Sequence, residues 1–408
     1  MSDDIVEESI PDLEPLVFPS EGLPELIDSQ SQLEEACLAL QSGTGPIAID
    51  AERASSYRYS ARAYLIQLRR AGSGTFLIDP ISISDFSNLS RTLKDAEWIL
   101  HAATQDLSCL AELSLIPTKL FDTEHAGRLL GRERVGLQAL LESEMQLSLA
   151  KEHSAADWST RPLPEPWLAY AALDVEKLIE LRELLLIDLV NKDRLHWAQQ
   201  DFDNLISWKP SPALPEPWRR TSGIHQVRQP GQLAIVRELW FERDRLGRDR
   251  DKAVSKILPD AAIIDIAKLD LKSAKEIYLL DSLRNRSHKA LADLWWQARQ
   301  KALALPESEL PKSNSGQSSI PPTKAWEEKN PAAHEKFTKL RPKVLEVADS
   351  YAVAPEIIIS PEVIRQLCWQ AHETMSNHSE LDTWLDGQNV RQWQSELMSP
   401  IIKNLLFS

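Results

Sequence analysis

The stretch from Gly45 to Glu52, Gly-Pro-Ile-Ala-Ile-Asp-Ala-Glu, constrains this chain most, because it predicts a buried strand that ends in two acids. Side chains alternate between the faces of a strand, so Asp50 and Glu52 are expected on the same side. Two adjacent carboxylates repel each other unless a cation lies between them or one stays protonated. Hard divalent ions such as Mg²⁺ or Mn²⁺ suit such a pair. For this motif alone, a solvated strand end remains the alternative.

Length and composition predict a soluble protein of two or three domains. The chain has 408 residues, of which 43% are hydrophobic and 26% are charged, enough for proper cores. It contains no run of about eighteen apolar residues and no signal peptide, so we expect a cytoplasmic protein without a membrane partner. Cys37, Cys109 and Cys368 are far apart, which favours buried thiols over a zinc site.

The negative charge of the chain is unevenly distributed. The net charge is -15, and the first 46 residues hold eleven acids and no Lys or Arg. Residues 217–304 instead hold 18 basic and 11 acidic side chains, a net charge of +7. A polyanion is expected to meet this basic block. On charge alone, an ordinary solvated helical surface remains the alternative.

Elements predicted from periodicity and turn residues place the acids on a mixed α/β fold. An acidic, flexible lead is expected over residues 1–22. Strands are predicted over 45–52, 63–68, 75–79 and 98–101, the second and third forming a hairpin. Helices are predicted over 29–40, 85–94, 104–113, 123–130, 137–144 and, as one long helix, 164–190. Hairpin strands followed by alternating strands and helices predict a mixed sheet flanked by helices.

Asp106 lies in the first turn of the helix that follows the fourth strand. A carboxylate there has an ordinary explanation, because the helix dipole favours acids at a helix N-terminus. His101, which closes the strand, is either a hydrogen-bonded residue or a ligand or base.

Tyr170 and Asp174 lie four residues apart in the long predicted helix and therefore share one face. Asp is unfavourable inside a helix, and binding a metal would explain it, although an Asp that faces water remains the alternative. Together with Asp50, Glu52 and Asp106, Asp174 completes a set of carboxylates that suits a two-metal phosphodiester hydrolase. Tyr170 would then hold or orient the attacking water.

The order Asp-x-Glu, Asp, Tyr-x-x-x-Asp resembles the DEDD exonucleases of the tyrosine subclass, which have a ribonuclease H-like fold. Residues 155–163, leading into Leu168–Val175, look like ribonuclease D in particular. The resemblance covers about residues 23–205. It implies 3′-to-5′ hydrolysis of RNA to nucleoside 5′-monophosphates, with structured RNA 3′ ends such as tRNA precursors as substrates.

The same resemblance implies a role for each acid. Asp50, Glu52 and Asp174 would bind one divalent cation, and Asp50 and Asp106 would serve a second directly or through water. Tyr170 would orient the nucleophile.

Arg53 is a departure from this family pattern, since many relatives carry a small polar or aromatic residue after the Glu. The handling of the terminal base is therefore open. Two alternatives also remain open: a non-catalytic nucleic-acid-binding adaptor, and the same chemistry on DNA. The intact carboxylate set favours the enzyme.

Beyond the exonuclease region (23–207), a Pro-rich linker is predicted over 208–226, a helical domain over 227–304, a second linker over 305–331 and another helical domain over 332–408. Arg237–Trp240 and Ile257–Asp260 resemble the helicase-and-ribonuclease-D C-terminal (HRDC) domain, which implies a nucleic-acid-positioning module. Arg284, Arg286 and Lys289 are its candidate nucleic-acid contacts. The last domain resembles a degenerate HRDC domain. A monomer is expected, because three linked domains can enclose the site.

Overall fold

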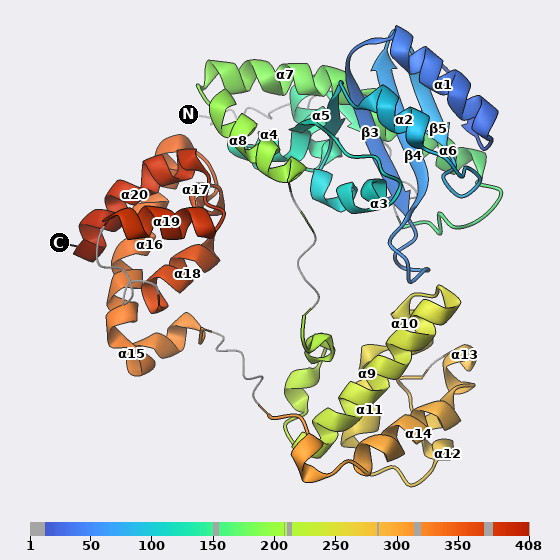
Figure 1. Ribbon diagram of the computed structural model, residues 1–408, viewed down its shortest axis with the longest axis vertical. Coiled ribbons are helices and arrows are strands. Elements are labelled where there is room, and N and C mark those ends of the chain that lie inside the picture. The colour runs from blue at the N-terminus through green and yellow to red at the C-terminus, as the bar shows by residue number, and fades with distance from the viewer. Residues whose placement is uncertain are drawn as a thin grey trace, which may run out of the picture.

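The computed structural model describes residues 13–149, 155–207, 209, 214–283, 285–313, 320–370 and 378–407. Figure 1 shows one α/β group, coloured blue to green, and two groups of helices that follow it in the chain. The first twelve residues of the predicted lead, and Arg284, lie outside the described residues. No described helix combines the length and the apolar character needed to cross a membrane.

The α/β group is built on a six-stranded sheet in the order β2-β5-β4-β3-β6-β7. Its strands are β2 (Leu26–Ile27), β3 (Thr44–Arg53), β4 (Ala63–Ala71), β5 (Gly74–Ile78), β6 (Glu97–Leu100) and β7 (Lys119–Asp122). The β3–β4 and β4–β5 pairs are antiparallel, and the other pairs are parallel. The predicted mixed sheet is confirmed, although β2 and β7 were not predicted.

Alternation along β3 divides the core of this group into two layers. Ile47 and Ile49 pack with the helices on one face of the sheet, whereas Ala48 packs with those on the other. The first layer contains α1 (Gln30–Ser42), α2 (Ser87–Leu93) and α3 (Leu107–Glu112). The second contains α4 (Thr123–Leu129), α5 (Leu137–Met145), α6 (Glu165–Glu176), α7 (Leu178–Asn191) and α8 (Leu195–Ile206).

The predicted lead and the long predicted helix were wrong in extent. The lead does not reach residue 22 without structure, because β1 (Glu14–Leu16) pairs in parallel with β8 (Leu147–Leu149), which satisfies the backbone groups along one of its edges. The long helix over 164–190 is two helices, since α6 ends before Lys177 and α7 begins after it. Both helices still bury leucines in the core, so the apolar pattern runs through the break without revealing it.

The middle helical group has a hydrophobic core of its own, which includes Leu239, Ile263 and Trp295. Its helices are α9 (Pro230–Arg250), α10 (Val254–Ile257), α11 (Asp260–Lys268), α12 (Ala274–Tyr278), α13 (Arg286–Lys289) and α14 (Ala292–Leu303). Trp218, from the stretch predicted as linker, lies on a short 3₁₀ helix (Pro217–Arg220) and is buried in this core. The end of that stretch therefore packs with the helices that follow it.

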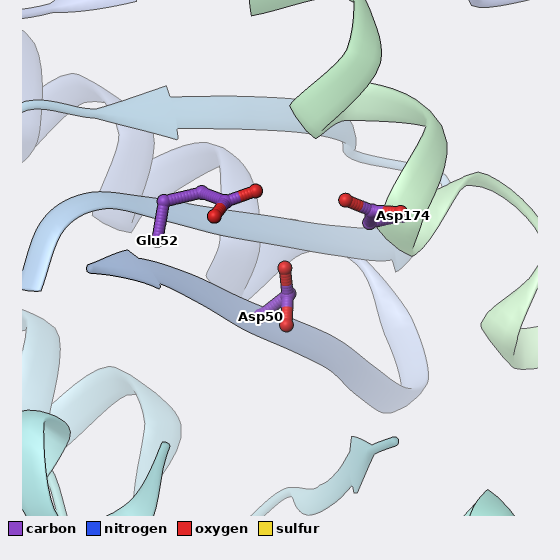
Figure 2. Close-up of side chains that lie close together, drawn as sticks. All are labelled: Asp50, Glu52 and Asp174. Atoms are coloured by element: carbon purple, nitrogen blue, oxygen red, sulfur yellow. The ribbon is translucent and has the colours of Figure 1, made fainter. Parts of the chain in front are cut away.

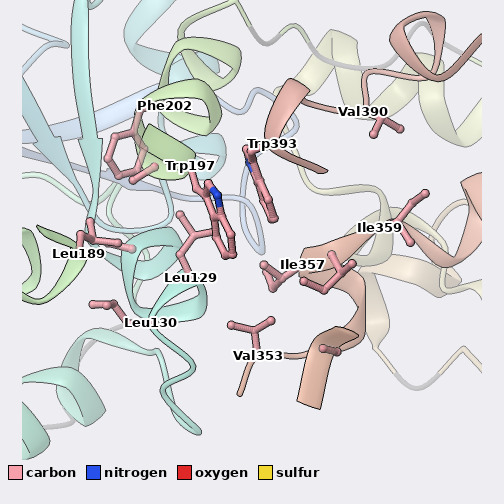
Figure 3. Close-up of a cluster of buried hydrophobic side chains, with 14 of the residues drawn as sticks. Leu129, Leu130, Leu189, Trp197, Phe202, Val353, Ile357, Ile359, Val390 and Trp393 are labelled. Atoms are coloured by element: carbon pink, nitrogen blue, oxygen red, sulfur yellow. The ribbon is translucent and has the colours of Figure 1, made fainter. Parts of the chain in front are cut away.

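The last helical group shares its core with the α/β group. Its helices are α15 (Trp326–Lys329), α16 (Pro331–Tyr351), α17 (Pro355–Ile358), α18 (Pro361–Trp369), α19 (His378–Gly387) and α20 (Gln392–Phe407). Trp197 of α8 stacks on Trp393 of α20 with ring centroids 4.3 Å apart (Figure 3). Close by, a Cβ atom on Gly131 would lie 1.9 Å from the carbonyl oxygen of Ala352. The two surfaces are therefore in close contact.

Candidate active site

Three carboxylates from two elements converge on one point. Asp50 and Glu52 project from β3 and Asp174 from α6, and one oxygen of each lies within 4.8 Å of the others. Figure 2 shows the three side chains pointing toward one another. They line a cavity of about 370 Å³, so the group is open to a ligand. The predicted shared face of Asp50 and Glu52 agrees with this placement.

Asp106 lines the same cavity from a different element. The predicted helix over 104–113 is replaced by a 3₁₀ turn (Ala103–Gln105) and the short helix α3, and Asp106 lies at their junction. Its side chain is buried, and its Oδ1 lies 3.7 Å from Nη2 of Arg53. Asp106 is not one of the three mutually close residues, but the cavity brings all four acids together.

Burial raises the pKa of every acid in this group, and repulsion between the carboxylates adds to the rise for Glu52, Asp106 and Asp174. Burial raises the pKa of Asp50 to about 6. Burial, followed by the charges of Asp50 and Asp174, raises the pKa of Glu52 to about 10. The pKa values of Asp106 and Asp174 also rise well above the ordinary range, through burial and then the charge of Asp50. Such a cluster holds its protons until cations replace them, which fits oxygen-ligated divalent metals.

Tyr170 lies one turn before Asp174 on α6 and lines the cavity. Its hydroxyl donates a hydrogen bond to the Asp174 carboxylate. Burial and the nearby negative charges raise the pKa of Tyr170 further above its usual value, so the phenol stays protonated. A neutral hydroxyl suits orientation of a water molecule better than proton abstraction.

Comparison with known proteins assigns the chain to a family. Residues 24–189 match the model described as "3'-5' exonuclease", and residues 319–406 match "3' to 5' exonuclease C-terminal domain". Ribonuclease D of Escherichia coli is 28% identical over 394 residues, which cover 94% of this chain and 98% of the relative. The chain belongs to the ribonuclease D family.

Solved structures agree with this family assignment. The crystal structure of Escherichia coli RNase D superposes with a TM-score of 0.69 at 26% identity, covering 94% of this chain and 98% of the other. A protein from Bifidobacterium adolescentis matches with a TM-score of 0.88 and 36% identity over 97% of this chain and 100% of that one. The ribonuclease H-like exonuclease fold expected from the sequence is thus confirmed.

Several lining residues of this ribonuclease D-family cavity gave no signal in the sequence. Ser55, Ser56 and Gln105 lie on loops or a short turn, where no periodic pattern marks a buried face. His101 also lines the cavity, with Nδ1 2.9 Å from Oγ1 of Thr123. Burial lowers the pKa of His101, which favours the neutral ring.

Of the candidate nucleic-acid contacts, the two that the structure describes, Arg286 and Lys289, do not line the carboxylate cavity. Arg286 begins α13 and is exposed, and the Lys289 ammonium lies 5.0 Å from the centre of the Tyr278 ring. Arg284 lies outside the described residues. Arg286 and Lys289 belong to the middle helical group, so any contact they make with RNA would be separate from the chemistry.

Proposed function

We propose that this chain is a metal-dependent 3′-5′ exoribonuclease that releases nucleoside 5′-monophosphates from RNA 3′ ends. The convergence of Asp50, Glu52 and Asp174, with Asp106 beside them in one cavity, carries the proposal. Family membership supports it, and the Escherichia coli relative is described as "an exoribonuclease involved in structured RNA processing". We therefore propose structured RNA 3′ ends, such as those of tRNA precursors, as the substrate class.

Asp50, Glu52 and Asp174 would hold one divalent cation, and Asp50 with Asp106 would hold the second directly or through water. Mg²⁺ or Mn²⁺ fits this donor set, because all four ligands are carboxylates. Burial, and for Glu52 also repulsion, disfavours their ionised form unless cations neutralise the charge. Bound there, such cations favour deprotonation of a water and stabilise the negative charge on the leaving oxygen.

The remaining residues of the cavity position the reactants. The Tyr170 hydroxyl, held by its hydrogen bond to Asp174, would orient the attacking water toward the phosphorus. The lining of the cavity includes the solvent-exposed loop residues Ser55 and Ser56, so a strand end could enter beside them.

The middle helical group would act as an HRDC module that positions the RNA, and the last group as a degenerate module of the same type. The net charge of +7 over residues 217–304 supports attraction to a polyanion. Arg286 and Lys289 would contact phosphates, so replacing both with Ala should weaken RNA binding and reduce its salt dependence. The free thiols of Cys37, Cys109 and Cys368 are compatible with the cytoplasm, where we place a monomer.

Shortening of a 5′-labelled RNA with a free 3′ end tests the proposal, with 3′-blocked RNA and matched DNA alongside, in Mg²⁺, Mn²⁺ or chelator. We expect a metal-dependent ladder on the free RNA only. Asp50→Asn should abolish the ladder with little loss of RNA affinity, and Tyr170→Phe should slow it about 10²-fold. Tight binding without shortening would favour the adaptor, and shortening of DNA alone would change the substrate. Normal turnover by Asp50→Asn would contradict the metal assignment.

A further inference from the structure

Arg53 is the last residue of β3 and directly follows Glu52. Strict alternation would place its side chain on the face opposite to Glu52. The ladder with β4 is irregular at this point, because Arg53 pairs with Ala63 and Tyr64 is skipped. Irregularities of this kind re-aim a side chain at the end of a strand. Arg53 accordingly lines the same cavity as the carboxylates.

Among the described residues that line the cavity, Arg53 is the only Lys or Arg. Its Nη2 lies 3.7 Å from Oδ1 of Asp106, and its side chain is 28% exposed. This separation is that of a loose ion pair, not of a bidentate hydrogen-bonded one. Burial raises the pKa values of Asp50 and Asp106, and the charge of Arg53 opposes that rise. The guanidinium therefore acts on Asp50, Glu52 and Asp106 without being fixed to one acid.

The balance of charges in the site suggests that this guanidinium interacts with the phosphate of the substrate. Two divalent cations would balance the four carboxylates, but a scissile phosphodiester brings a negative charge of its own. That charge spreads over the non-bridging oxygens as the reaction proceeds. A guanidinium is always positive, and its planar set of donors matches phosphate oxygens. Arg53 is the side chain of this cavity that can supply both the charge and the donors.

We propose that Arg53 is a further catalytic residue, which donates hydrogen bonds to a non-bridging oxygen of the scissile phosphate and stabilises the transition state. This inference rests on the proposed function. In the step, a water oxygen bonds to phosphorus while the bond from phosphorus to the 3′ oxygen of the penultimate nucleotide breaks. One water proton ends on that 3′ oxygen, directly or through solvent, which gives a nucleoside 5′-monophosphate and an RNA shortened by one residue. Arg53 stays protonated throughout.

The test compares Arg53→Gln and Arg53→Lys with the wild type and with Arg91→Gln. Arg91 is an exposed residue of α2, in the helix layer on the opposite face of the sheet from α6, so its variant removes the same charge away from the cavity. The kcat and KM values are measured on 5′-labelled RNA at saturating Mn²⁺. Mn²⁺ affinity is measured by calorimetry on each protein without RNA. Circular dichroism reports whether each variant folds.

We expect Arg53→Gln to lower kcat about 10²–10³-fold with a smaller change in KM, while Mn²⁺ affinity is kept or increased. Arg53→Lys, which keeps the charge but loses the planar donors, should fall between this variant and the wild type. It also provides the test if Arg53→Gln does not fold.

Equal kcat values for Arg53→Gln and Arg91→Gln would overturn the inference. So would weakened Mn²⁺ binding together with full recovery of kcat at saturating Mn²⁺, because Arg53 would then act only on the carboxylates. If the wild type itself left the RNA intact, the proposed function would fail and this inference with it. If the wild type shortened the RNA and Arg53→Gln did so at the same rate, only this inference would fail and the proposed function would stand.

Discussion

The two helical groups are joined to the α/β group in different ways. The middle group contacts it through polar groups on the loop after β3: Tyr59 donates to Asp244 at 2.9 Å, and the Ser60 amide donates to Asp251 at 2.9 Å. The last group is joined through a continuous hydrophobic core in which Trp197 stacks on Trp393. Buried apolar area stabilises a contact far more than exposed polar pairs do.

This difference predicts two units of stability in one chain. The α/β group and the last group should unfold together, because neither can lose the shared core alone. The middle group has a separate core and should unfold by itself. The catalytic domain and the last group are thus linked through their stability, whereas the middle group is held to the α/β group by polar contacts.

The largest expected effect comes from removing the stacked ring at the shared core. Trp393 is 1% exposed, and Trp393→Ala should cost about 3–5 kcal/mol of unfolding free energy. Scanning calorimetry should show a lower melting temperature for the α/β unit and an unchanged transition for the middle group. Trp295→Ala, at a fully buried position of the middle core, is the matched control and should do the reverse. A single transition that shifts equally in both variants would refute the two-unit description.

A smaller effect is expected from Asp201, which accepts a hydrogen bond from the indole N–H of Trp393. Asp201 is 2% exposed, lies 2.6 Å from Nε2 of His125, and accepts a hydrogen bond from Arg391 of the last group. Burial alone would raise the pKa of Asp201, but the hydrogen bonds and charges of His125 and Arg391 outweigh it and lower the pKa. Asp201→Asn should cost about 2 kcal/mol at pH 7.

The sign of the pH dependence follows from that lowered pKa. The ionised Asp201 stabilises the fold above its unfolded pKa of about 3.9, and this contribution disappears as the pH falls through the lower folded value. The difference in unfolding free energy between the wild type and Asp201→Asn should therefore shrink between about pH 5 and pH 3. Urea denaturation at several pH values measures it, and a difference that grows on acidification would contradict the assignment.

The smallest effect is expected at the polar joint to the middle group. Asp251 ends α9 with φ 44°, a left-handed conformation that Gly tolerates, so Asp251→Gly removes the carboxylate without backbone strain. Loss of the Ser60 contact should cost about 1 kcal/mol of docking and leave both thermal transitions nearly unchanged. Small-angle scattering should detect a larger radius of gyration. Arg245→Ala, which removes two surface ion pairs of α9, should leave the radius as in the wild type.

Features set by local sequence could be predicted, whereas features set by contacts with distant parts of the chain could not. The pairing of Asp50 with Glu52 on one face needs only the period of a strand, and it is confirmed. The inward turn of Arg53 depends on an irregularity set by β4, which no local pattern reveals. The break at Lys177 is hidden for a similar reason, because the leucine pattern continues across it.

The shared core was invisible for another reason. The apolar pattern of α8 is the same whether its own domain or a distant one packs on it. The sequence around Trp197 therefore did not predict its contact with Trp393. The short strand β1 is fixed by its partner β8, and three residues are too few for a periodic pattern. The family resemblance identified the four carboxylates, but it gave no information on how the domains are joined.

Gly131 lies where the α/β group meets the last helical group, and that contact restricts which residues the position can accept. Its backbone has φ 76°, which Asn also adopts with little strain, yet any Cβ there would collide with the Ala352 carbonyl. An exonuclease that had lost its last helical group could therefore accept Asn at this position, whereas a chain that keeps the group cannot. A residue other than Gly at this position in a related chain would thus indicate that its C-terminal helices are absent or lie elsewhere.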